Sequence, residues 1–366
     1  MKKIGIICEY NPLHNGHIYH IKKIKEMFPD SSIIAVMSGN FTQRGDLSLI
    51  EKKDKANIAL NYGIDLVIEL PFIFATQSAD VFADAAIRIL NQINIDYLIF
   101  GSESNNIKLL TSLANIQLNN IDYNKQVKIL LDEGINYPTA MSQALKKFSN
   151  ETIRDPNDLL GLSYVKAIIK TNSKIIPLTI KRTNDFHSIE SNDTDIISAS
   201  AIRNLFLNNK KIDNFVPEKV KNILCNNNKN YNYYYFLKYK ILSEGKNIKK
   251  YLTVDEGIEN RLLKYIEKTD SIEELIEKVK TKRYTYNKIS RMFIHILCSL
   301  TKEEANKNKD IKFIRVLAFN EVGQKILSNI KKDMKIPLIT TEKYYKDLLE
   351  FDTRIDKLYN MITKSK

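Results

Sequence analysis

The segment KIGIICEYNPLHNGHIYH, residues 3–20, carries the strongest evidence for the fold. Its first part, residues 3–10, is a short apolar run typical of a strand that is buried on both faces. A turn at residues 11–12 follows, and residues 17–27 show the pattern of a helix. A buried strand that leads through a tight turn into a helix is typical of the first unit of an α/β fold.

Apolar runs and helical patterns alternate as far as about residue 205. The runs predict further strands at residues 31–39, 64–71, 95–103 and 174–182. Helical patterns lie at residues 52–63, 80–93 and 198–206. Continuous apolar strands that alternate with helices predict a Rossmann-like parallel sheet covered by helices on both faces.

The pattern changes beyond about residue 206. Helical periodicity dominates residues 231–300, while residues 226–230 and 301–310 have the composition of connectors. Two further apolar runs, at residues 312–320 and 334–341, can add short strands. The second part of the chain is therefore predicted to be mainly helical.

The charge also divides the chain near residue 206. Residues 1–205 contain 22 Lys+Arg and 22 Asp+Glu, whereas residues 206–366 contain 34 and 21, so the whole net charge of +13 lies in the second part. That part also holds twelve of the nineteen tyrosines. Cations among aromatic rings favour an RNA partner, although tyrosines are also common in protein cores. We predict an α/β domain at residues 1–205 and a mainly α-helical, basic, RNA-binding domain at residues 206–366.

Cysteines and hydropathy limit the class of protein. The three cysteines, Cys8, Cys225 and Cys298, are scattered and odd in number, which argues against a disulfide framework and fits a reducing cytoplasm. The apolar run at the N-terminus ends before Glu9 and is too short for a signal peptide. No run approaches the ~20 apolar residues of a membrane span. We expect a cytoplasmic protein without a membrane segment; the sequence does not predict the oligomeric state.

The strongest chemical signal is His14-Asn15-Gly16-His17, after the first predicted strand. The motif thus lies at the carboxyl end of that strand, which is the edge of an open α/β sheet where ligands bind. Gly16 lets the backbone approach a phosphate, and the start of the next helix offers free N–H groups to an anion. His14 and His17 can donate hydrogen bonds to phosphate oxygens and stabilise the charge that develops there. A metal site that includes His20 and a purely structural role are the alternatives, but no HExxH pattern or suitably spaced carboxylate supports the metal site.

HNGH after a first strand resembles the HxGH motif of the nucleotidyltransferase superfamily. Seven further stretches narrow the resemblance. They are SGNFTQRGD (38–46), ELPFIFATQSADVFADAAI (69–87), FGSES (100–104), PNDLLGLSYVKAI (156–168), TIKRTNDFHS (179–188), ISASAIR (197–203) and RYTYNKISRMFIHIL (283–297). Together with GIICEYNPLHNGH (5–17), they resemble the bacterial tRNA(Met) cytidine acetate ligase family.

The resemblance implies a two-step reaction. Acetate and ATP give acetyl-adenylate and pyrophosphate, and the acetyl group then passes to the exocyclic amine of the wobble cytidine of elongator tRNA(Met). Adenylation turns an acetate oxygen into a leaving group, so the site needs groups that orient phosphate rather than a covalent nucleophile. ATP is then a substrate, and Mg²⁺ is expected to accompany it. No metal site built by the protein itself is predicted.

The resemblance also implies which residues act on ATP. His14 and His17 are the implied catalytic residues. The other implied ATP-binding residues are Ile7, Cys8, Glu9, Tyr10, Asn11, Pro12, Leu13, Asn15, Gly16, Ile18, Tyr19, His20, Gly101, Asn157, Lys181, Arg182, Ser198, Ser200 and Arg203.

The later members of that set also have simpler interpretations. Gly101 can be a plain turn glycine, and Asn157 can cap the helix that follows it. Lys181 and Arg182 can be solvated surface cations. The serines of ISASAIR can cap a surface helix instead of contacting phosphate.

Two segments are predicted to lie near the substrates without a firm role. The QRG loop, residues 43–45, is expected beside the active site or the tRNA end. Lys282, Arg283, Tyr284 and Arg291 form the densest basic and aromatic cluster, which would either follow the tRNA backbone or be a solvated helix face. Two other functions remain open: an adenylyltransferase that makes a nucleotide cofactor, and a non-catalytic RNA-binding protein.

Overall fold

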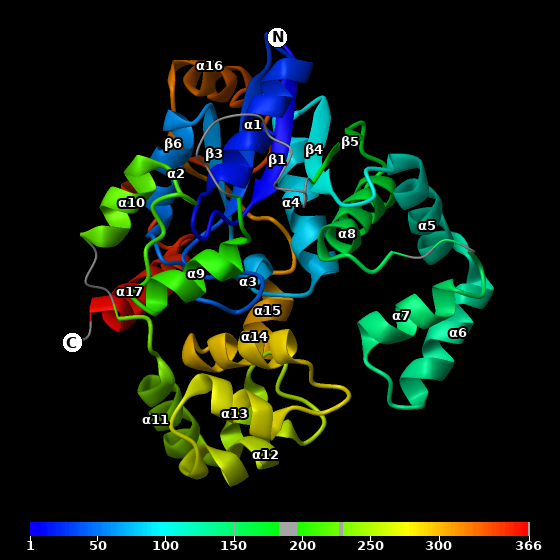
Figure 1. The fold of residues 1–366 in the computed structure, drawn as a ribbon, viewed down its shortest axis with the longest axis vertical. Helices are drawn as coiled ribbons and strands as arrows, with labels where there is room; N and C mark the ends of the chain where they lie inside the picture. The colour runs from blue at the N-terminus through cyan, green and yellow to red at the C-terminus, as the bar shows by residue number, and fades with distance from the viewer. Residues whose placement is uncertain (150, 152, 183–195, 227–229, 365–366) are drawn as a thin grey trace.

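The computed structural model describes residues 1–366 except residues 150, 152, 183–195, 227–229 and 365–366 (Figure 1). Within the described residues, seven strands form a sheet in the order β5-β4-β1-β2-β3-β6-β7. The strands are β1 (Lys3–Cys8), β2 (Ser32–Ser38), β3 (Leu66–Leu70), β4 (Tyr97–Ser102), β5 (Ile176–Lys181), β6 (Ile314–Phe319) and β7 (Leu338–Ile339).

The five strands expected before residue 205 are confirmed as β1 to β5. Each of them pairs in parallel with its neighbours among the five. Every residue of β2 and β3 is buried, as expected of strands covered on both faces. Alternate side chains enter opposite cores: Ile34 and Val36 lie in one core, and Ile33 and Ala35 lie in the other.

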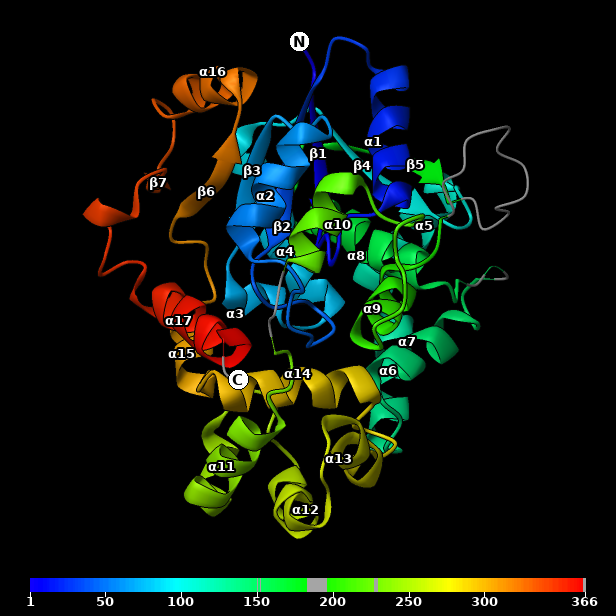
Figure 2. The same ribbon diagram turned by 60° about the vertical axis from the view of Figure 1, so that its left-hand side comes forward.

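Helices cover both faces of the sheet (Figures 1 and 2). One core contains side chains of α1 (Asn15–Met27), α2 (Lys52–Asn61), α9 (Ala199–Leu207) and α10 (Glu218–Cys225). The opposite core contains side chains of α4 (Ala79–Ile93) and α8 (Pro156–Lys170). The predicted α/β architecture is thereby confirmed.

A group of helices lies at one end of the molecule, away from the sheet (Figures 1 and 2). Its members are α11 (Tyr234–Glu244), α12 (Ile258–Tyr265), α13 (Ile272–Val279) and α14 (Tyr286–Leu297). These helices confirm the helical pattern expected after residue 231. In the part of the chain that the structure describes, no helix is long and apolar enough to cross a membrane.

The chain after residue 206 does not stay apart from the sheet. β6 pairs antiparallel with β3, and β7 pairs in parallel with β6, so the sheet is mixed rather than wholly parallel. α16 (Glu321–Ile330) packs beside these strands, and α17 (Glu350–Lys364) follows them. The two short strands suggested by the sequence are thus present, and they join the first part of the chain. A boundary at residues 205–206 therefore does not divide the sheet from the later chain.

Buried charges fasten the end of the chain to the sheet. Lys52 Nζ of α2 lies 2.8 Å from Glu69 Oε1 of β3 and 2.6 Å from Asp356 Oδ2 of α17. Arg315 Nη2 of β6 lies 3.2 Å from the same Asp356 oxygen. Lys52 and Arg315 are almost fully buried, and a buried charge that loses its partner is strongly destabilising. Asp356 is 304 residues away from Lys52 in the chain, which is why local patterns did not predict this network.

Some elements differ from the sequence-based expectation. Three helices, α5 (Ile107–Asn119), α6 (Ile121–Asp132) and α7 (Tyr137–Leu145), were not predicted. The connector expected at residues 301–310 contains α15 (Lys302–Lys307), in which Thr301 and Glu304 form a reciprocal capping box. A capped helix of six residues is too short to show periodicity. The other expected connector includes residues 227–229, which lie outside the described residues.

Candidate active site

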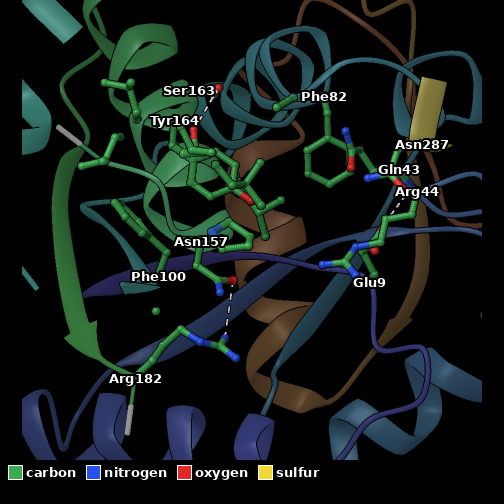
Figure 3. A pocket seen from close by; sticks show the side chains of 18 of the residues that line it. Glu9, Gln43, Arg44, Phe82, Phe100, Asn157, Ser163, Tyr164, Arg182 and Asn287 are labelled. Atoms are coloured by element: carbon green, nitrogen blue, oxygen red, sulfur yellow. Dashed lines mark hydrogen bonds between the residues drawn. The ribbon is translucent and has the colours of Figure 1, made fainter. Parts of the chain in front are cut away.

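A cavity of about 1310 Å³ lies at the carboxyl ends of β1, β4 and β5 (Figure 3). Its walls come from the loop after β1, from α7, α8 and α9, from the QRG loop and from the start of α14. This is the edge at which open α/β sheets bind ligands. The volume exceeds the ~300–1,000 Å³ of ordinary small-molecule sites, so the cavity has room for more than one substrate.

The two histidines of HNGH cap the helix that they begin. His14 is the N-cap residue of α1, and its Nδ1 accepts a hydrogen bond from Gly16 N at 3.1 Å. His17 Nδ1 in turn accepts one from His14 N at 3.2 Å. The centroids of the two rings are 3.7 Å apart. Both imidazoles take the places that Ser and Glu occupy in an ordinary capping box, which explains the three-residue spacing.

This capping determines where the imidazole protons lie. Burial, followed by the nearby positive charge of Arg182, lowers the pKa of His14 to about 4 and that of His20 to about 4. Burial and the neighbouring His14, His20 and Arg182 also lower the pKa of His17. The rings are therefore neutral at neutral pH. Because Nδ1 of His14 and of His17 accepts a hydrogen bond, each ring carries its proton on Nε2 and is a donor there.

Gly16 and Tyr10 have backbone geometry that this arrangement requires. A Cβ on Gly16 would lie 2.9 Å from His14 Cε1 and 3.0 Å from Ile196 Cγ2, so a side chain would displace the ring. Tyr10 has a positive φ of 46°, which is strained for a residue other than glycine. Its side chain is buried, and its ring centroid lies 4.7 Å from that of His17. Packing on both sides of the turn holds the histidines in place.

Arg182 directly follows β5, and its side chain contacts a residue after β4 and a residue of α8. Its Nη1 lies 3.5 Å from Asn157 Oδ1, and its Nε lies 3.8 Å from Glu103 Oε1 (Figure 3). Asn157 also donates to Glu103, whereas the N-cap position of α8 is Asp155, so Asn157 does not cap the helix. A Cβ on Gly101 would lie 3.1 Å from Arg182 Cγ. Gly101 therefore makes room for the arginine stem.

The ISASAIR residues form a second wall of the cavity. Ser198 caps α9 by accepting a hydrogen bond from Ala201 N. Arg203 donates to Asn11 O and to Asp46 Oδ2, both at 2.9 Å. Ser200 Oγ accepts from Arg203 Nη2 at 3.2 Å and from Arg44 Nη1 at 3.1 Å. In this structure Arg203 ties α9 to the loop after β1.

The QRG loop connects that wall to α14. Gly45 has φ +85°, and a Cβ there would lie 2.5 Å from Arg291 N, so the glycine lets the loop touch the helix backbone. Ser290 Oγ donates to Gly45 O at 3.0 Å, and Arg291 Nη1 donates to Gln43 O at 3.2 Å. The loop expected beside the active site or the tRNA end thus lies between the cavity and the helical group.

The predicted cluster at residues 282–291 does not form one surface. Tyr284 is 2% exposed, and its hydroxyl is hydrogen-bonded to the backbone at residues 253–255. Arg291 lines the cavity, where burial lowers its pKa to about 10. Lys282 and Arg283 are exposed. Residues 281–285 form a loop before α14, so helical spacing does not place these four side chains on one face.

Most of the predicted site residues meet in the cavity. Those that line it are Ile7, Cys8, Glu9, Tyr10, Asn11, His14, Gly16, His17, Tyr19, His20, Gly101, Asn157, Lys181, Arg182, Ser198, Ser200 and Arg203. Pro12, Leu13, Asn15 and Ile18 do not line it. Leu13 is a core residue, and the Asn15 side chain donates to Asn214 O at 2.8 Å, because side chains of one turn cannot all face the same way. Residues 183–188 of the TIKRTNDFHS stretch lie outside the described residues.

Gln43 and Arg44 of the QRG loop, which was expected beside the active site or the tRNA end, also line the cavity (Figure 3). Other lining residues were missed from the sequence. They include Phe82, Phe100, Tyr137, Lys146, Arg154, Ser163, Tyr164 and Asn287. The aromatic ones lie in apolar runs that resemble core segments, and Tyr137 belongs to a helix that was not predicted. Among the described residues, no group of three His, Cys, Asp or Glu side chains is arranged to hold a metal ion.

Comparison with known proteins agrees with the geometry of this site. Residues 1–366 match the model of the family HIGH Nucleotidyl Transferase. The tRNA(Met) cytidine acetate ligase of Caldicellulosiruptor saccharolyticus is 38% identical over 374 aligned residues, covering 98% of this chain and 94% of the relative. The protein of the same name from Clostridium novyi is 38% identical and covers 100% and 96%.

A solved structure extends the comparison to three dimensions. The crystal structure of Thermotoga maritima TmcAL bound with alpha-thio ATP superposes with a TM-score of 0.87 at 32% identity, covering 100% of this chain and 95% of that one. Its apo form gives a TM-score of 0.88 at the same identity. The HNGH turn, the capped helix and the cavity at the strand ends therefore occur in a chain whose whole length matches one family. The chain belongs to the tRNA(Met) cytidine acetate ligases, within the HIGH nucleotidyl transferase family.

Proposed function

We propose that this chain is an ATP-dependent ligase that activates acetate as acetyl-adenylate and acetylates the wobble cytidine of elongator tRNA(Met). The observation that carries the proposal is the pair of neutral histidines, His14 and His17, whose Nε2–H groups are set by reciprocal capping beside the cavity. The name of the relatives supports the tRNA substrate. The bound alpha-thio ATP of the T. maritima protein supports ATP as the nucleotide.

In the first step an acetate oxygen attacks the α-phosphorus of ATP, and pyrophosphate leaves. The Nε2–H groups of His14 and His17 donate to phosphate oxygens as charge builds there. Arg182, whose positive charge acts on both rings, adds a cation at the same end of the cavity. Cys8 is no competing nucleophile, because burial raises the pKa of its thiol to about 12.

Mg²⁺ is expected to enter with the phosphates of ATP. The described residues provide no group of three metal-binding side chains in this cavity, so oxygen atoms of the nucleotide and water would supply most of its ligands. The ion would withdraw charge from the phosphates of ATP. The protein side chains described above would orient the nucleotide.

In the second step the cytidine base has to reach the acyl group. The cavity is large enough for a second substrate, and its wall carries exposed cations at Arg44, Lys146 and Arg154. Tyr137, which is 50% exposed, offers a ring on which an unstacked base can lie. We place the anticodon loop at this side of the cavity, between α7 and the start of α14. The enzyme would encounter such a tRNA substrate in the cytoplasm.

The decisive experiment is isotope exchange between labelled pyrophosphate and ATP. We expect exchange that depends on acetate and does not require tRNA, because activation precedes transfer. Labelled acetate should then appear in tRNA(Met) when the tRNA is added. Exchange without acetate but with a phosphorylated cofactor precursor would favour the adenylyltransferase, and no exchange in any mixture would favour a binding protein. A requirement for acetyl-CoA in place of ATP and acetate would contradict the proposed mechanism.

A further inference from the structure

Glu9 is a carboxylate at the end of β1 that the proposed activation step does not use. Its side chain lines the cavity and is partly buried. Oε1 accepts a hydrogen bond from Gln43 N at 2.7 Å and lies 3.5 Å from Ser38 Oγ. Oε2 accepts no hydrogen bond from the described residues. One oxygen thus anchors the carboxylate, and the other is available to a ligand.

The backbone under Glu9 is also held firmly. The ammonium group of Lys55 is buried and donates to Glu9 O at 2.9 Å, to Ser38 O at 3.0 Å and to Gly39 O at 2.8 Å. It binds the carboxyl ends of β1 and β2 together directly behind Glu9. The QRG loop supplies the hydrogen bond in front, from Gln43 N. Glu9 is therefore fixed from two sides. A side chain that reacts with a substrate atom needs a fixed position of this kind.

The charges around Glu9 differ from those around the histidines. Arg182 acts on His14, His17 and His20. The charged groups that act on Glu9 are Lys55, Asp46 and Arg44. Figure 3 shows Glu9 beside Gln43 and Arg44, with Asn157 and Arg182 on the other side of the cavity. A carboxylate repels phosphate, so the phosphates belong at the Arg182 end and Glu9 faces the part of the cavity toward α14.

The transfer step requires a proton acceptor. The exocyclic amine of cytidine is a weak nucleophile because its lone pair is delocalised into the ring. When it attacks the acyl carbon it must lose a proton, or the adduct reverts. General-base assistance of this kind typically contributes ~10²–10⁴-fold to a rate.

We propose that Glu9 takes the proton from the N4 amine of the acceptor cytidine during acetyl transfer, and that the QRG loop positions it. The proposal rests on the proposed function. The amine lone pair forms the new C–N bond while the bond between the acyl carbon and the AMP oxygen breaks. AMP leaves with that electron pair, and the amine proton moves to Glu9 Oε2.

The environment of Glu9 suits this role. Burial raises the pKa of its carboxyl above the ordinary range, although the backbone N–H of Gln43 and the charge of Lys55 oppose the shift. A base with a raised pKa is a stronger proton acceptor while it remains ionised near neutral pH. The transfer rate should therefore rise with pH until Glu9 is deprotonated.

The test measures the two half-reactions separately in the full-length protein. Glu9→Gln keeps the volume of the side chain and an oxygen that accepts from Gln43 N. We expect single-turnover acetyl transfer to tRNA to fall ~10²-fold or more. Acetate-dependent pyrophosphate exchange should fall much less, because Glu9 acts as the base only in the transfer step. Glu9→Asp keeps a base but moves it. Its transfer rate should lie between those of wild type and Glu9→Gln, and its pH–rate profile should retain the acidic limb. Glu26→Gln, on the exposed side of α1, is the matched control and should change neither step.

Three results would overturn the assignment. They are near-normal transfer by Glu9→Gln, an equal loss of exchange and transfer, and an acidic limb that persists unchanged in Glu9→Gln. Failure of the wild-type protein to exchange pyrophosphate with acetate would instead contradict the proposed function. Thermal unfolding of each variant shows whether a reduced activity reflects an unfolded protein.

Discussion

The two ends of the cavity are built in different ways. At the histidine end, nearby residues cap their own helix, so His14 and His17 are oriented by hydrogen bonds that span only two and three positions. At the α14 end, the QRG loop meets a helix 245 residues away in the sequence, through Ser290 and Gly45. The first end depends mainly on local backbone geometry. The second depends on the packing of the helical group against the sheet, and the two should therefore respond differently to mutation.

The largest expected effect is at the histidine end. His17→Ala removes one Nε2–H donor, and loss of one such donor typically costs ~10²–10³ in rate. We expect the acetate-dependent exchange of pyrophosphate to fall by that factor. Lys22→Ala, on an exposed position of the same helix, should leave exchange unchanged. Near-normal exchange by a folded His17→Ala protein would remove His17 from the catalytic role.

A substitution where the QRG loop touches α14 should lower the stability of the protein. Gly45→Ala places a Cβ 2.5 Å from the α14 backbone at a positive φ, and we expect it to lower the free energy of unfolding by roughly 2–4 kcal/mol. Gly257→Ala is the matched control, because that residue also has a positive φ but its new Cβ would lie 3.7 Å from Asn260 Nδ2, an ordinary van der Waals distance. Its cost should be the backbone strain alone, roughly 1–2 kcal/mol. Equal losses of stability in denaturant unfolding would show that the close approach to α14 is unimportant.

The buried histidines predict how stability depends on pH. The pKa of folded His14 is about 4, below the usual 6.5, so the unfolded chain binds its proton first. Stability should therefore fall as the pH drops from about 6.5 to about 4, by about 3 kcal/mol for His14 alone. His14→Asn keeps a good N-cap residue and removes this titration. Unfolding curves should show a shallower pH dependence for the variant; an unchanged slope would contradict a neutral, buried His14.

The smallest expected effect concerns the exposed cations beside the α14 end. Lys282→Ala with Arg283→Ala should weaken tRNA binding a few-fold and flatten its salt dependence, by up to ~0.9 in slope for each phosphate that is no longer neutralised. Exchange of pyrophosphate should not change, since neither side chain lines the cavity. Lys331→Ala with Lys332→Ala removes the same charge at the end of α16, on the opposite side of the molecule (Figure 2). An equal effect of both pairs would indicate net charge rather than a recognition surface.

Local patterns were sufficient for the strands of the first part of the chain, although not for the helices α5, α6 and α7. The five strands before residue 205 are short apolar runs between turns and helical patterns, so composition alone reveals them. The HNGH turn was predictable for the same reason, because a helix start, its capping residues and the strand end all lie within eighteen positions. The side of the turn that each residue faces was less predictable, and Pro12, Leu13, Asn15 and Ile18 do not reach the cavity.

The alternating α/β order, the position of the HNGH turn at the sheet edge and the family could all be predicted from the sequence. Tertiary packing, in contrast, adds β6 and β7 to the sheet, buries Tyr284 while Arg291 faces the cavity, and brings the QRG loop to Glu9. The difference comes from the range of the interactions. Capping and strand burial are set by neighbouring residues, whereas ion pairs such as Lys52–Asp356 and hydrogen bonds such as Ser290–Gly45 form only when distant segments pack together.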